Sequence, residues 1–266
     1  MAKISCIVIT YNESRNIRRC LQNVSWADEI VLVDAYSTDD TKRIASEFTD
    51  KIYELRWAGF GPAKEFARNK AEGDWILSVD ADEVVSEKLR DEIQKIAESE
   101  NSLDGYYIPR TSNFLGRWIK HGGWYPDLVL RLFRKDKGNF TSRPVHEEVR
   151  VSGRTGHLEN DLLHYTDPDF DHYLKKLNRY TSLDALQLYK EGRSAKLLDI
   201  FLRPPTTFVK MYLFKRGFSD GVAGLILAVS SGFHVFSKYV KLWHLNQFQG
   251  EGRARNIKTF KRTTAS

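Results

Sequence analysis

The chain has 266 residues, of which 41% are hydrophobic and 29% are charged. These proportions are typical of a globular protein and exclude an intrinsically disordered chain. The length allows one full domain with an appendage, or two small domains. The two cysteines, Cys6 and Cys20, are too few for a disulfide framework, so we expect both to be reduced and packed in the interior.

The net charge of +6 is distributed unevenly along the chain. Residues 171–266 contain 17 Lys and Arg against 6 Asp and Glu, whereas residues 1–170 contain 24 against 29. Such an asymmetry predicts an anionic partner for the C-terminal part, either a membrane surface or a nucleic acid. The N-terminus opens directly into a strand pattern without a secretion signal, so we expect a cytoplasmic location.

The first hundred residues alternate between apolar strand patterns and helical patterns. Strands are expected over residues 4–10, 29–34, 51–55 and 74–80. Helices are expected over residues 16–22, 41–48, 63–72 and 86–98, the last with Ser86 as its N-terminal cap. Repeated β-α-β units with strongly apolar strands predict an α/β fold, in which helices cover both faces of a mostly parallel sheet.

The pattern changes after residue 103. Strands are expected over residues 105–110, 128–134 and 145–151, with a turn at 136–138. From Phe170 onward the pattern is helical and ends in a polar, basic tail. We therefore expect a first domain over residues 1–168 and a helical appendage over residues 169–266.

Polar side chains follow three of the predicted strands where these strands end. Ile9-Thr10-Tyr11-Asn12-Glu13 closes the first strand, Asp34 closes the second, and Asp80-Ala81-Asp82 closes a later one. Open α/β sheets bind their ligands at this carboxyl edge. There an aromatic ring and an amide can hold a flat base, and paired acids can bind Mg²⁺ or Mn²⁺ carrying a diphosphate. The alternative is that these residues only cap helices and solvate loops.

These segments, with Ser37-Thr38-Asp39-Asp40-Thr41 and Ala67-Arg68-Asn69, resemble the motifs of glycosyltransferase family 2, the inverting enzymes of GT-A fold. The resemblance covers roughly residues 3–150. It implies a nucleotide-sugar donor, usually UDP-linked, and a divalent cation, Mg²⁺ or Mn²⁺. It also implies functions for particular residues: Thr10, Tyr11, Glu13 and Asp34 as nucleoside contacts, Asp80 and Asp82 as ribose and metal contacts, and Lys64, Arg68 and Asn69 as groups that reach the diphosphate or the sugar. For Lys64 the alternative is a position on a solvated helix face.

Family 2 enzymes usually carry their general base in a Glu-Asp pair, which this chain lacks. Val145-His146-Glu147-Glu148 stands in its place, so Glu147 is the candidate base and Asp127 the alternative. The base would take the proton of the acceptor hydroxyl as that hydroxyl attacks the anomeric carbon. His164 is a candidate third metal ligand, because some GT-A enzymes use a late histidine. The alternatives are that Glu147 is an exposed edge-strand residue and that His164 is structural.

The C-terminal part mixes large apolar residues with evenly spaced basic ones over residues 200–245. Its most apolar run, residues 221–236, has 16 residues, fewer than the roughly 20 needed to span a bilayer. Basic flanks and aromatic residues favour helices that lie in the interface of an anionic membrane. The alternative is a helical subdomain that packs on the sheet or on a second subunit. The alternation of basic and large aliphatic residues disfavours nucleic acid as a partner.

Residues 203–205, 215–221 and 238–243 resemble the branch of family 2 that adds glucose to the inner-core heptose of bacterial lipopolysaccharide. This resemblance implies a lipid-linked saccharide acceptor and a peripheral location on the inner face of the cytoplasmic membrane. A sugar-nucleotide nucleotidyltransferase and a non-catalytic sugar-nucleotide-binding module are alternative functions. A Rossmann dehydrogenase is disfavoured, because the chain lacks the G-x-G-x-x-G fingerprint. The sequence leaves homo-oligomerisation open.

Overall fold

The structure is a computed structural model and describes residues 2–141, 149–167 and 169–247. Its contacts divide the chain into two compact units. The first comprises residues 1–112 and 125–166, and the second comprises residues 113–124 and 167–266. The division after residue 166 lies close to the boundary expected from the sequence. The inclusion of residues 113–124 in the second unit is not foreseen by the sequence pattern.

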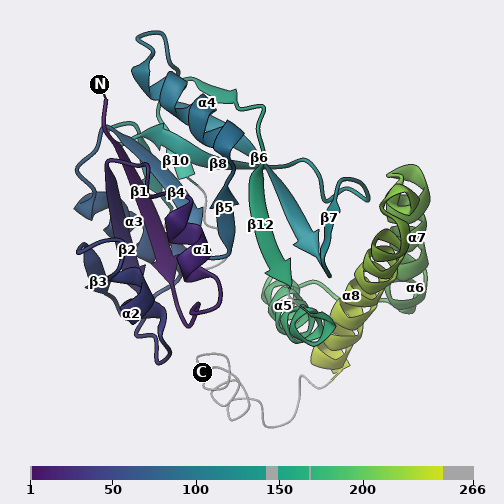
Figure 1. Cartoon of the computed structure of the whole chain (residues 1–266). Coiled ribbons are helices and arrows are strands. Elements are labelled where there is room, and N and C mark those ends of the chain that lie inside the picture. The colour runs from purple at the N-terminus through teal and green to yellow at the C-terminus, as the bar shows by residue number, and fades with distance from the viewer. Residues whose placement is uncertain (1, 142–148, 168, 248–266) are drawn as a thin grey trace. The chain divides into compact units, whose positions relative to one another are not determined.

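The first unit is built on a mixed sheet (Figure 1). Four parallel strands form its N-terminal half in the order β3-β2-β1-β4: β1 (Ile4–Thr10), β2 (Glu29–Asp34), β3 (Ile52–Glu54) and β4 (Trp75–Asp80). The order continues as β8-β6-β12-β5, with strands β5 (Glu83–Val85), β6 (Gly105–Phe114), β8 (Asp127–Arg134) and β12 (Leu162–Asp167). Because β8 is antiparallel to both β4 and β6, the sheet changes from parallel to antiparallel at β4.

Three short strands complete this unit. β11 (Thr155–His157) pairs in parallel with β6, and β9 (Gly138–Phe140) and β10 (Val149–Val151) form a separate antiparallel pair. The turn expected at 136–138 lies at residues 135–137, between β8 and β9. Of the strand expected over 145–151, residues 149–151 form β10, and the rest lies outside the described residues.

Helices cover both faces of the sheet, because successive strand side chains point to opposite faces. Cys6 and Val8 of β1 belong to a buried cluster with α1, α2 and α4, whereas Ile7 and Ile9 belong to a second cluster with α3. The four helices are α1 (Ile17–Gln22), α2 (Thr41–Ala45), α3 (Phe60–Lys70) and α4 (Glu87–Glu98). Both cysteines are buried and free, as expected, and burial raises the pKa of the Cys6 and Cys20 thiols.

The helix boundaries follow local chemistry. The Ser86 hydroxyl accepts a hydrogen bond from the backbone N–H of Leu89 at 3.3 Å, which confirms Ser86 as the cap of α4. α3 begins at Phe60, earlier than the expected Ala63, because the proline at position 62 is tolerated in a first helical turn. Gly59 precedes the helix with a φ of 114°, a conformation that other residues rarely adopt.

The second unit consists mainly of helices: α5 (Phe170–Lys190), α6 (Leu197–Phe201), α7 (Arg203–Val209) and α8 (Gly221–Gln247). A π-helix, η1 (Lys210–Phe214), and a 3₁₀-helix, η2 (Gly217–Asp220), connect α7 to α8. The inserted segment contributes β7 (Arg117–Ile119). Its Phe114 and Ile119 form a buried cluster with residues of α5 and α8: Tyr173, Leu177, Ala223 and Leu227.

Asp220 fixes the inserted segment to the helices of the second unit. Its buried carboxylate accepts a hydrogen bond from the backbone N–H of His121 at 2.8 Å and lies 3.0 Å from Nδ1 of the same histidine. The N–H of Gly122 donates to the carbonyl of Lys215 at 2.9 Å. The insert is therefore held by polar contacts as well as by its apolar core.

The C-terminal helix is longer than the apolar run suggested. Residues 217–247 are long and apolar enough to cross a membrane by length and composition, with only 33% of the most apolar stretch buried. The expectation that this region is too short to span a bilayer is therefore wrong as a statement of length. The run continues through Tyr239, Val240, Leu242 and Trp243, which the count of residues 221–236 left out.

Candidate active site

The ends of β1, β2 and β4 lie at one edge of the sheet of the first unit. β1 is the central strand of the three, and it pairs in parallel with both neighbours. Thr10 is opposite Asp34, and Ile9 is opposite Asp80. Because neighbouring strands are about 4.8 Å apart, Asp34 and Asp80 flank the end of β1 at a separation of roughly 10 Å. The structure thus brings together the three strand ends that the sequence singled out.

Asp34 organises the loops that follow β1 and β2. Its side chain is buried, and it accepts hydrogen bonds from the Ser37 backbone N–H at 2.7 Å and the Ser37 hydroxyl at 2.5 Å. Asn12, which has a φ of 53°, donates its N–H to the Ser37 oxygen at 2.8 Å. The Asn12 side-chain oxygen in turn accepts from the Thr38 N–H at 2.8 Å. The two loops therefore form one rigid, hydrogen-bonded rim.

Two tyrosines on this rim are half exposed: Tyr11 follows β1 and Tyr36 follows β2, with exposed fractions of 48% and 49%. The Thr10 hydroxyl is buried and has no hydrogen-bond partner among the described residues. Glu13 is partly buried, and its carboxylate accepts from the Asn16 side-chain amide at 2.8 Å. The rim thus combines exposed aromatic rings with buried acceptors, which suits a flat, polar ligand such as a nucleoside.

Asp39 fastens the outer part of the same rim. Its carboxylate accepts hydrogen bonds from Thr41 and from the Ser14 backbone N–H at 3.1 Å. Partial burial opposes ionisation, but the hydrogen bonds from Thr41 and Ser14 outweigh it and lower the pKa of Asp39 to about 2. The carboxylate is therefore ionised in neutral solution and serves the loop rather than proton transfer.

A chain of alternating charges runs from α3 across the end of β4 to β6 and β8. Lys64, whose residue is only 2% exposed, places its Nζ 2.9 Å from Asp80 Oδ1. Arg131 bonds both Asp80 and Glu83, with its Nη2 2.8 Å from Glu83 Oε1. Arg110 continues the chain from Glu83, at 3.0 Å, to Asp127, at 2.5 Å. Three acids and three bases therefore neutralise one another: Lys64, Asp80, Arg131, Glu83, Arg110 and Asp127.

This network keeps Asp80 ionised. Desolvation alone would raise its pKa, but the charges of Arg131 and Lys64 outweigh that effect and hold the pKa of Asp80 well below its usual value. Glu83 accepts the Asp80 backbone N–H at 2.9 Å, which fixes the turn after β4. Asp80 can therefore accept hydrogen bonds from a ligand, but it is a poor proton acceptor. Lys64 is buried and ion-paired, which rules out the alternative of a solvated helix face.

Asp82 lies outside this network and faces a histidine instead. His164 of β12 places its Nε2 3.1 Å from Asp82 Oδ2, and its Nδ1 lies 3.2 Å from the Ser112 hydroxyl of β6. The N–H of Tyr165 donates to the Asp82 carbonyl at 2.9 Å, so β12 holds the turn at this point. The structure thus brings together two of the three predicted metal ligands, Asp82 and His164. The third, Asp80, is ion-paired with basic side chains of the protein.

A metal site would have to be built around this pair. Among residues 2–141, 149–167 and 169–247, no three His, Cys, Asp or Glu side chains converge on one point. Mg²⁺ and Mn²⁺ commonly take only one or two protein ligands and complete their shell with substrate phosphates and water. The oxygen of Asp82 and the nitrogen of His164 fit that mode of binding, and they do not fit a cage made of protein groups alone.

Arg68 and Asn69 lie at the other edge of the sheet. The Arg68 Nη1 donates to the carbonyl of Lys135 at 3.1 Å, and the Lys135 N–H donates to the carbonyl of Asp74, just before β4 begins. Asn69 accepts a hydrogen bond from Arg68 at 3.0 Å. Both residues thus flank the amino end of β4, whereas Asp80 lies at its carboxyl end. They are therefore too far from the acidic strand ends to be proposed as diphosphate contacts. The helix periodicity explains this, since Arg68 is one turn farther from the carboxyl edge than Lys64.

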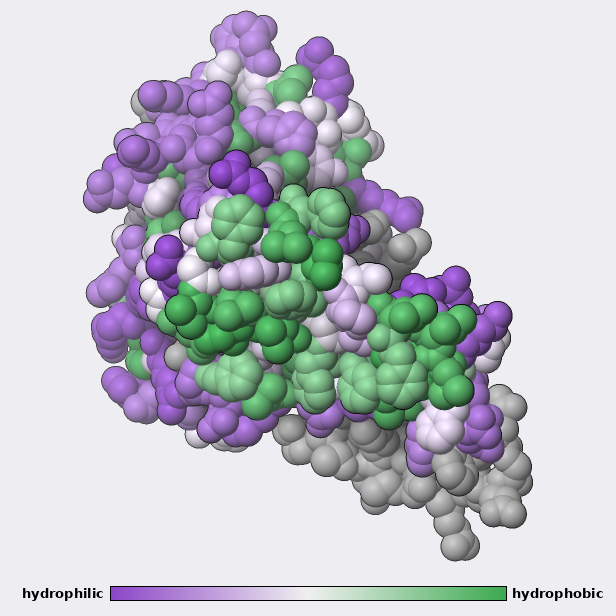
Figure 2. Space-filling view, turned by 90° about the vertical axis from the view of Figure 1, so that its right-hand side faces the viewer, coloured by the Kyte–Doolittle hydropathy of each residue, from purple (hydrophilic) through white to green (hydrophobic). Residues whose placement is uncertain are grey.

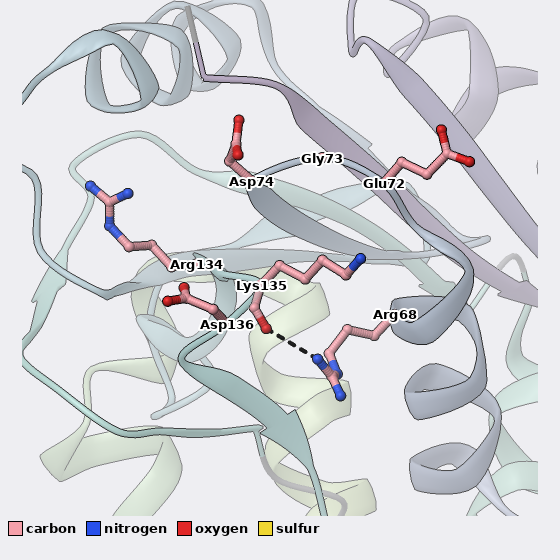
Figure 3. Close-up of a pocket in the computed structure, with 7 residues that line it drawn as sticks. All are labelled: Arg68, Glu72, Gly73, Asp74, Arg134, Lys135 and Asp136. Atoms are coloured by element: carbon pink, nitrogen blue, oxygen red, sulfur yellow. Dashed lines mark hydrogen bonds between the residues drawn. The ribbon is translucent and has the colours of Figure 1, made fainter.

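Arg68 instead lines an open pocket of about 580 Å³ (Figure 3). The pocket is bordered by both signs of charge: Arg68, Arg134 and Lys135 against Glu72, Asp74 and Asp136. Figure 3 shows the Arg68 side chain turned toward the Lys135 carbonyl. The mixture of charges favours no single class of ligand.

Of the two candidate bases, Glu147 and Asp127, the structure describes only Asp127. Glu147 lies outside the described residues, so no contact is assigned to it. Asp127 is at the start of β8, and its Oδ2 accepts both Nε and Nη2 of Arg110, at 2.9 and 2.5 Å. Both hydrogen bonds from Arg110 therefore fall on the same oxygen of Asp127, which is already engaged within the protein.

Sequence reasoning missed the residues that hold the acids in place: Arg110, Arg131, Glu83 and Ser112. One signal for Arg131 was available, because a charged residue inside the apolar run of residues 128–134 must find a partner when buried. Nothing local identifies Ser112, because its contact with His164 joins two strands that are distant in sequence.

The mixed sheet with helices on both faces and acids at its strand ends is an architecture of the GT-A type. Residues 5–154 match the model of glycosyl transferase family 2, so the chain belongs to that family. This membership makes the protein an enzyme that transfers a sugar.

Two relatives illustrate the similarity. The chain is 27% identical over 252 residues to the lipopolysaccharide core biosynthesis glycosyltransferase LpsC of Rhizobium meliloti, covering 90% of this chain and 92% of LpsC. It is 29% identical over 262 residues to an uncharacterized glycosyltransferase of Rickettsia prowazekii, covering 92% and 88%. Among solved structures, a fragment of S. aureus TarS in complex with UDP-GlcNAc matches with a TM-score of 0.46 and 17% identity, covering 88% of this chain and 81% of that one.

Proposed function

We propose that this protein transfers a sugar, glucose by the resemblance noted above, from a UDP-linked donor to a lipid-linked saccharide, with inversion at the anomeric carbon. The observation that carries the proposal is the convergence of Thr10, Asp34 and Asp80 at one sheet edge. It supplies acceptors for a nucleoside beside the acid-histidine pair that suits a diphosphate-bound cation.

The donor's nucleoside is proposed to lie on the rim formed by the loops after β1 and β2. The exposed ring of Tyr11 offers a stacking surface for the base. Asp34, Glu13 and the Thr10 hydroxyl supply acceptors and a donor for the base and ribose. Asp80, kept ionised by Lys64 and Arg131, is suited to accept hydrogen bonds from ribose hydroxyls.

Asp82 and His164 are proposed to hold Mg²⁺ or Mn²⁺ together with the diphosphate. When bound, the cation neutralises the charge that the departing nucleoside diphosphate gains. For His164 to bind through Nε2, its proton must sit on Nδ1, and the Ser112 hydroxyl at 3.2 Å is placed to accept it. Ser112 thereby orients the imidazole ring.

Glu147 is proposed as the general base, with Asp127 as the alternative. The base takes the proton of the acceptor hydroxyl while that oxygen attacks the anomeric carbon from the face opposite the leaving group. The bond between Arg110 and Asp127 supports Glu147, because it already occupies Oδ2 of Asp127.

The acceptor is proposed to be the phosphorylated inner core of a lipopolysaccharide, reached at the cytoplasmic face of the membrane. The support is the similarity to LpsC along nearly the whole chain, together with the basic C-terminal part. The same similarity favours sugar transfer over nucleotidyl transfer.

Calorimetry with UDP, with and without Mn²⁺, tests the donor site. We expect Mn²⁺ to strengthen UDP binding at least tenfold, and Asp82→Asn to remove most of that gain. The matched control is Asp136→Asn, an acid outside this edge of the sheet, which should leave the Mn²⁺ effect intact. Equal UDP affinity with and without the metal would end the assignment of Asp82 and His164.

Product analysis with deacylated lipid cores tests the reaction. Glu147→Gln is expected to abolish transfer from UDP-glucose while UDP binding stays within about twofold of the wild type, because the base does not touch the leaving group. Near-normal turnover of this variant would transfer the base to Asp127 or another carboxylate. Donor binding without transfer by the unaltered chain would favour the non-catalytic module.

A further inference from the structure

The longest helix of the second unit exposes a stripe of apolar side chains. The stripe runs along α8 at intervals of three or four residues, and its members are between 37% and 72% exposed: Val222, Leu225, Val229, Phe233 and Phe236. This interval places them on one face of the helix. The opposite face packs in the interior through Ala223, Gly224, Leu227 and Ala228. The helix is therefore apolar on both sides, and within residues 169–247 only one of these sides is buried.

The preceding short helices add to this apolar area. α6 exposes Leu197, Leu198 and Phe201, and Leu202 follows it, each exposed by more than half. Phe214 of η1 is 81% exposed, and α7 and η1 contain no buried residue. α7 packs against α8, and Figure 2 shows a broad hydrophobic surface on this unit. Soluble monomers rarely expose a contiguous apolar area of this kind without a partner.

The charges in the same helices are almost all basic. Residues 197–247 contain Arg203, Lys210, Lys215, Arg216, Lys238 and Lys241, but only two acids. One acid, Asp220, is buried against His121, and the other, Asp199, is paired with Arg203 at 2.6 Å. Of the basic residues, Arg203, Lys210, Lys215 and Arg216 are exposed, whereas Lys241 bonds α5 on the covered side of α8. The exposed charges near α7 and η1 are therefore basic, with almost no negative charge to balance them.

We propose that α6, α7, η1 and the exposed stripe of α8 form a docking surface for an anionic lipid bilayer, in which these helices lie flat in the interface. An apolar face with basic flanks matches both the hydrocarbon boundary and the negative headgroups. The inference deepens the proposed function and rests on it for the acceptor, because a lipid-linked acceptor resides in such a bilayer. Vesicle binding itself requires neither donor nor acceptor.

Charge favours a bilayer over a second copy of the chain as the occupant. A two-fold symmetric contact would set the same patch against itself, so its basic residues would face one another. Like charges across an interface oppose association, and residues 197–247 offer no free acid to offset them, since Asp199 is paired and Asp220 is buried. An anionic surface turns the same charges into an attraction.

Polar contacts on the covered side of α8 favour a flat helix over a spanning one. The Lys241 ammonium bonds the Asn178 carbonyl at 2.8 Å and the Thr181 hydroxyl at 2.7 Å, both on α5. His234 pairs with Asp184 of α5 at 3.2 Å. A spanning α8 would carry these polar groups of α5 into hydrocarbon or break their bonds, either of which is unfavourable.

Sedimentation of the full chain with vesicles tests the proposal. We expect binding to equimolar phosphatidylglycerol and phosphatidylethanolamine that is at least tenfold tighter than binding to phosphatidylcholine, and that weakens with salt. Val229→Ser combined with Phe233→Ser should weaken binding at least tenfold. Lys210→Gln should weaken it about fivefold, the effect of one basic residue near an anionic surface.

Two matched controls define the surface. Trp57→Ser removes an equally exposed aromatic residue from the first unit, and Lys95→Gln removes an exposed charge from α4, so both should bind vesicles like the wild type. Equal vesicle binding by the wild type and the Val229→Ser, Phe233→Ser variant would overturn the proposal. A vesicle-independent dimer that the same variant dissociates would assign the surface to a second copy.

An alkaline carbonate wash distinguishes lying from spanning. Release of the bound protein by the wash is expected for helices in the interface, whereas retention would show that α8 spans and would overturn the flat arrangement. UDP binding by the wild type in lipid-free buffer is measured in parallel. Vesicle binding without UDP binding would reject the donor site and leave the docking surface standing. UDP binding without vesicle binding would reject the docking surface and leave the donor site standing.

Discussion

The two units of this protein differ in which side chains they bury: the first buries charged groups, and the second exposes large apolar ones. In the first, charged groups leave water but neutralise one another, as Lys64, Asp80, Arg131 and Glu83 do beside β4. In the second, apolar side chains such as Phe214 and Phe233 are exposed by half or more. A buried charge network is rigid and suits a small, highly charged ligand, whereas uncovered apolar area suits an extended amphiphile. The charged side chains of the first unit thus find their partners within its own fold, whereas the partner of the apolar side chains in the second unit is the lipid surface proposed above.

The strongest challenge to this contrast is the removal of one charge from the network. Arg131→Met should lower the free energy of unfolding by about 3 kcal/mol, the low end for breaking a buried pair, because Asp80 keeps Lys64 and Glu83 keeps Arg110. Urea denaturation measures the change. The control is Arg18→Met, which breaks an exposed pair with Glu47 and should leave stability close to that of the wild type. A similar small effect at Arg131 would mean that the network is not a structural unit.

The acid limb of the stability profile tests the same network without a mutation. The pKa of Asp80 is held well below its usual value, so its contribution is fully present above the ordinary aspartate pKa of about 4. That contribution is lost as the pH falls through the lowered folded-state pKa. We therefore expect the contribution of Asp80 to thermal stability to be lost only below about pH 4. Arg131→Met should make this acid-induced loss smaller, because without the Arg131 charge the folded-state pKa of Asp80 lies closer to the ordinary value. An undiminished loss in the variant would contradict the effect assigned to Arg131.

A smaller effect is expected from the hydroxyl behind His164. Ser112→Ala should weaken Mn²⁺-supported UDP binding about tenfold, because the imidazole loses the group that orients it. The neighbouring Thr111→Val is the matched control, since the buried Thr111 hydroxyl has no partner among the described residues. Metal-free UDP affinity should stay unchanged in both variants. A drop in metal-free binding as well would point to a general packing defect.

The smallest expected effect lies on the exposed stripe of α8. Val229→Ser should change the free energy of unfolding by less than about 0.5 kcal/mol, because the side chain makes little contact in the folded protein. On the opposite face of the same helix, Leu227→Ala should cost about 2–5 kcal/mol, since Leu227 is buried. Thermal denaturation of the two variants in lipid-free buffer compares them directly. Equal destabilisation would show that protein covers both faces in solution.

The parallel half of the sheet could be predicted because its signals are local. The apolar runs of β1, β2 and β4 are continuous, each ends in polar residues, and Ser86 stands where a helix cap should. Parallel order then brings Asp34 and Asp80 to the same edge without further information. Sequence was sufficient wherever one segment decides its own structure.

The rest depends on contacts between segments that are distant in the chain. β5 has only three residues and exists because Val84 and Leu163 pair across the sheet. Asp80 is ion-paired with Arg131, and Asp127 is ion-paired with Arg110, on strands that are distant from each acid in the sequence or face it across the sheet. Arg68 was misplaced because the sequence motif specifies a helix but not the edge of the sheet at which each turn lies. Pairing and register, rather than propensity, decide these positions.

The segment between residues 113 and 124 sets a condition on how this protein can be divided. The polypeptide passes between the two units after residues 112, 124 and 166, and the insert places Phe114 and Ile119 in the core of the second unit. Truncation after residue 166 would remove the helices that cover these two side chains and leave an apolar segment exposed on the remaining fragment. The helical unit therefore cannot be exchanged as one continuous segment. A chimera that replaces it must replace both residues 113–124 and residues 167–266.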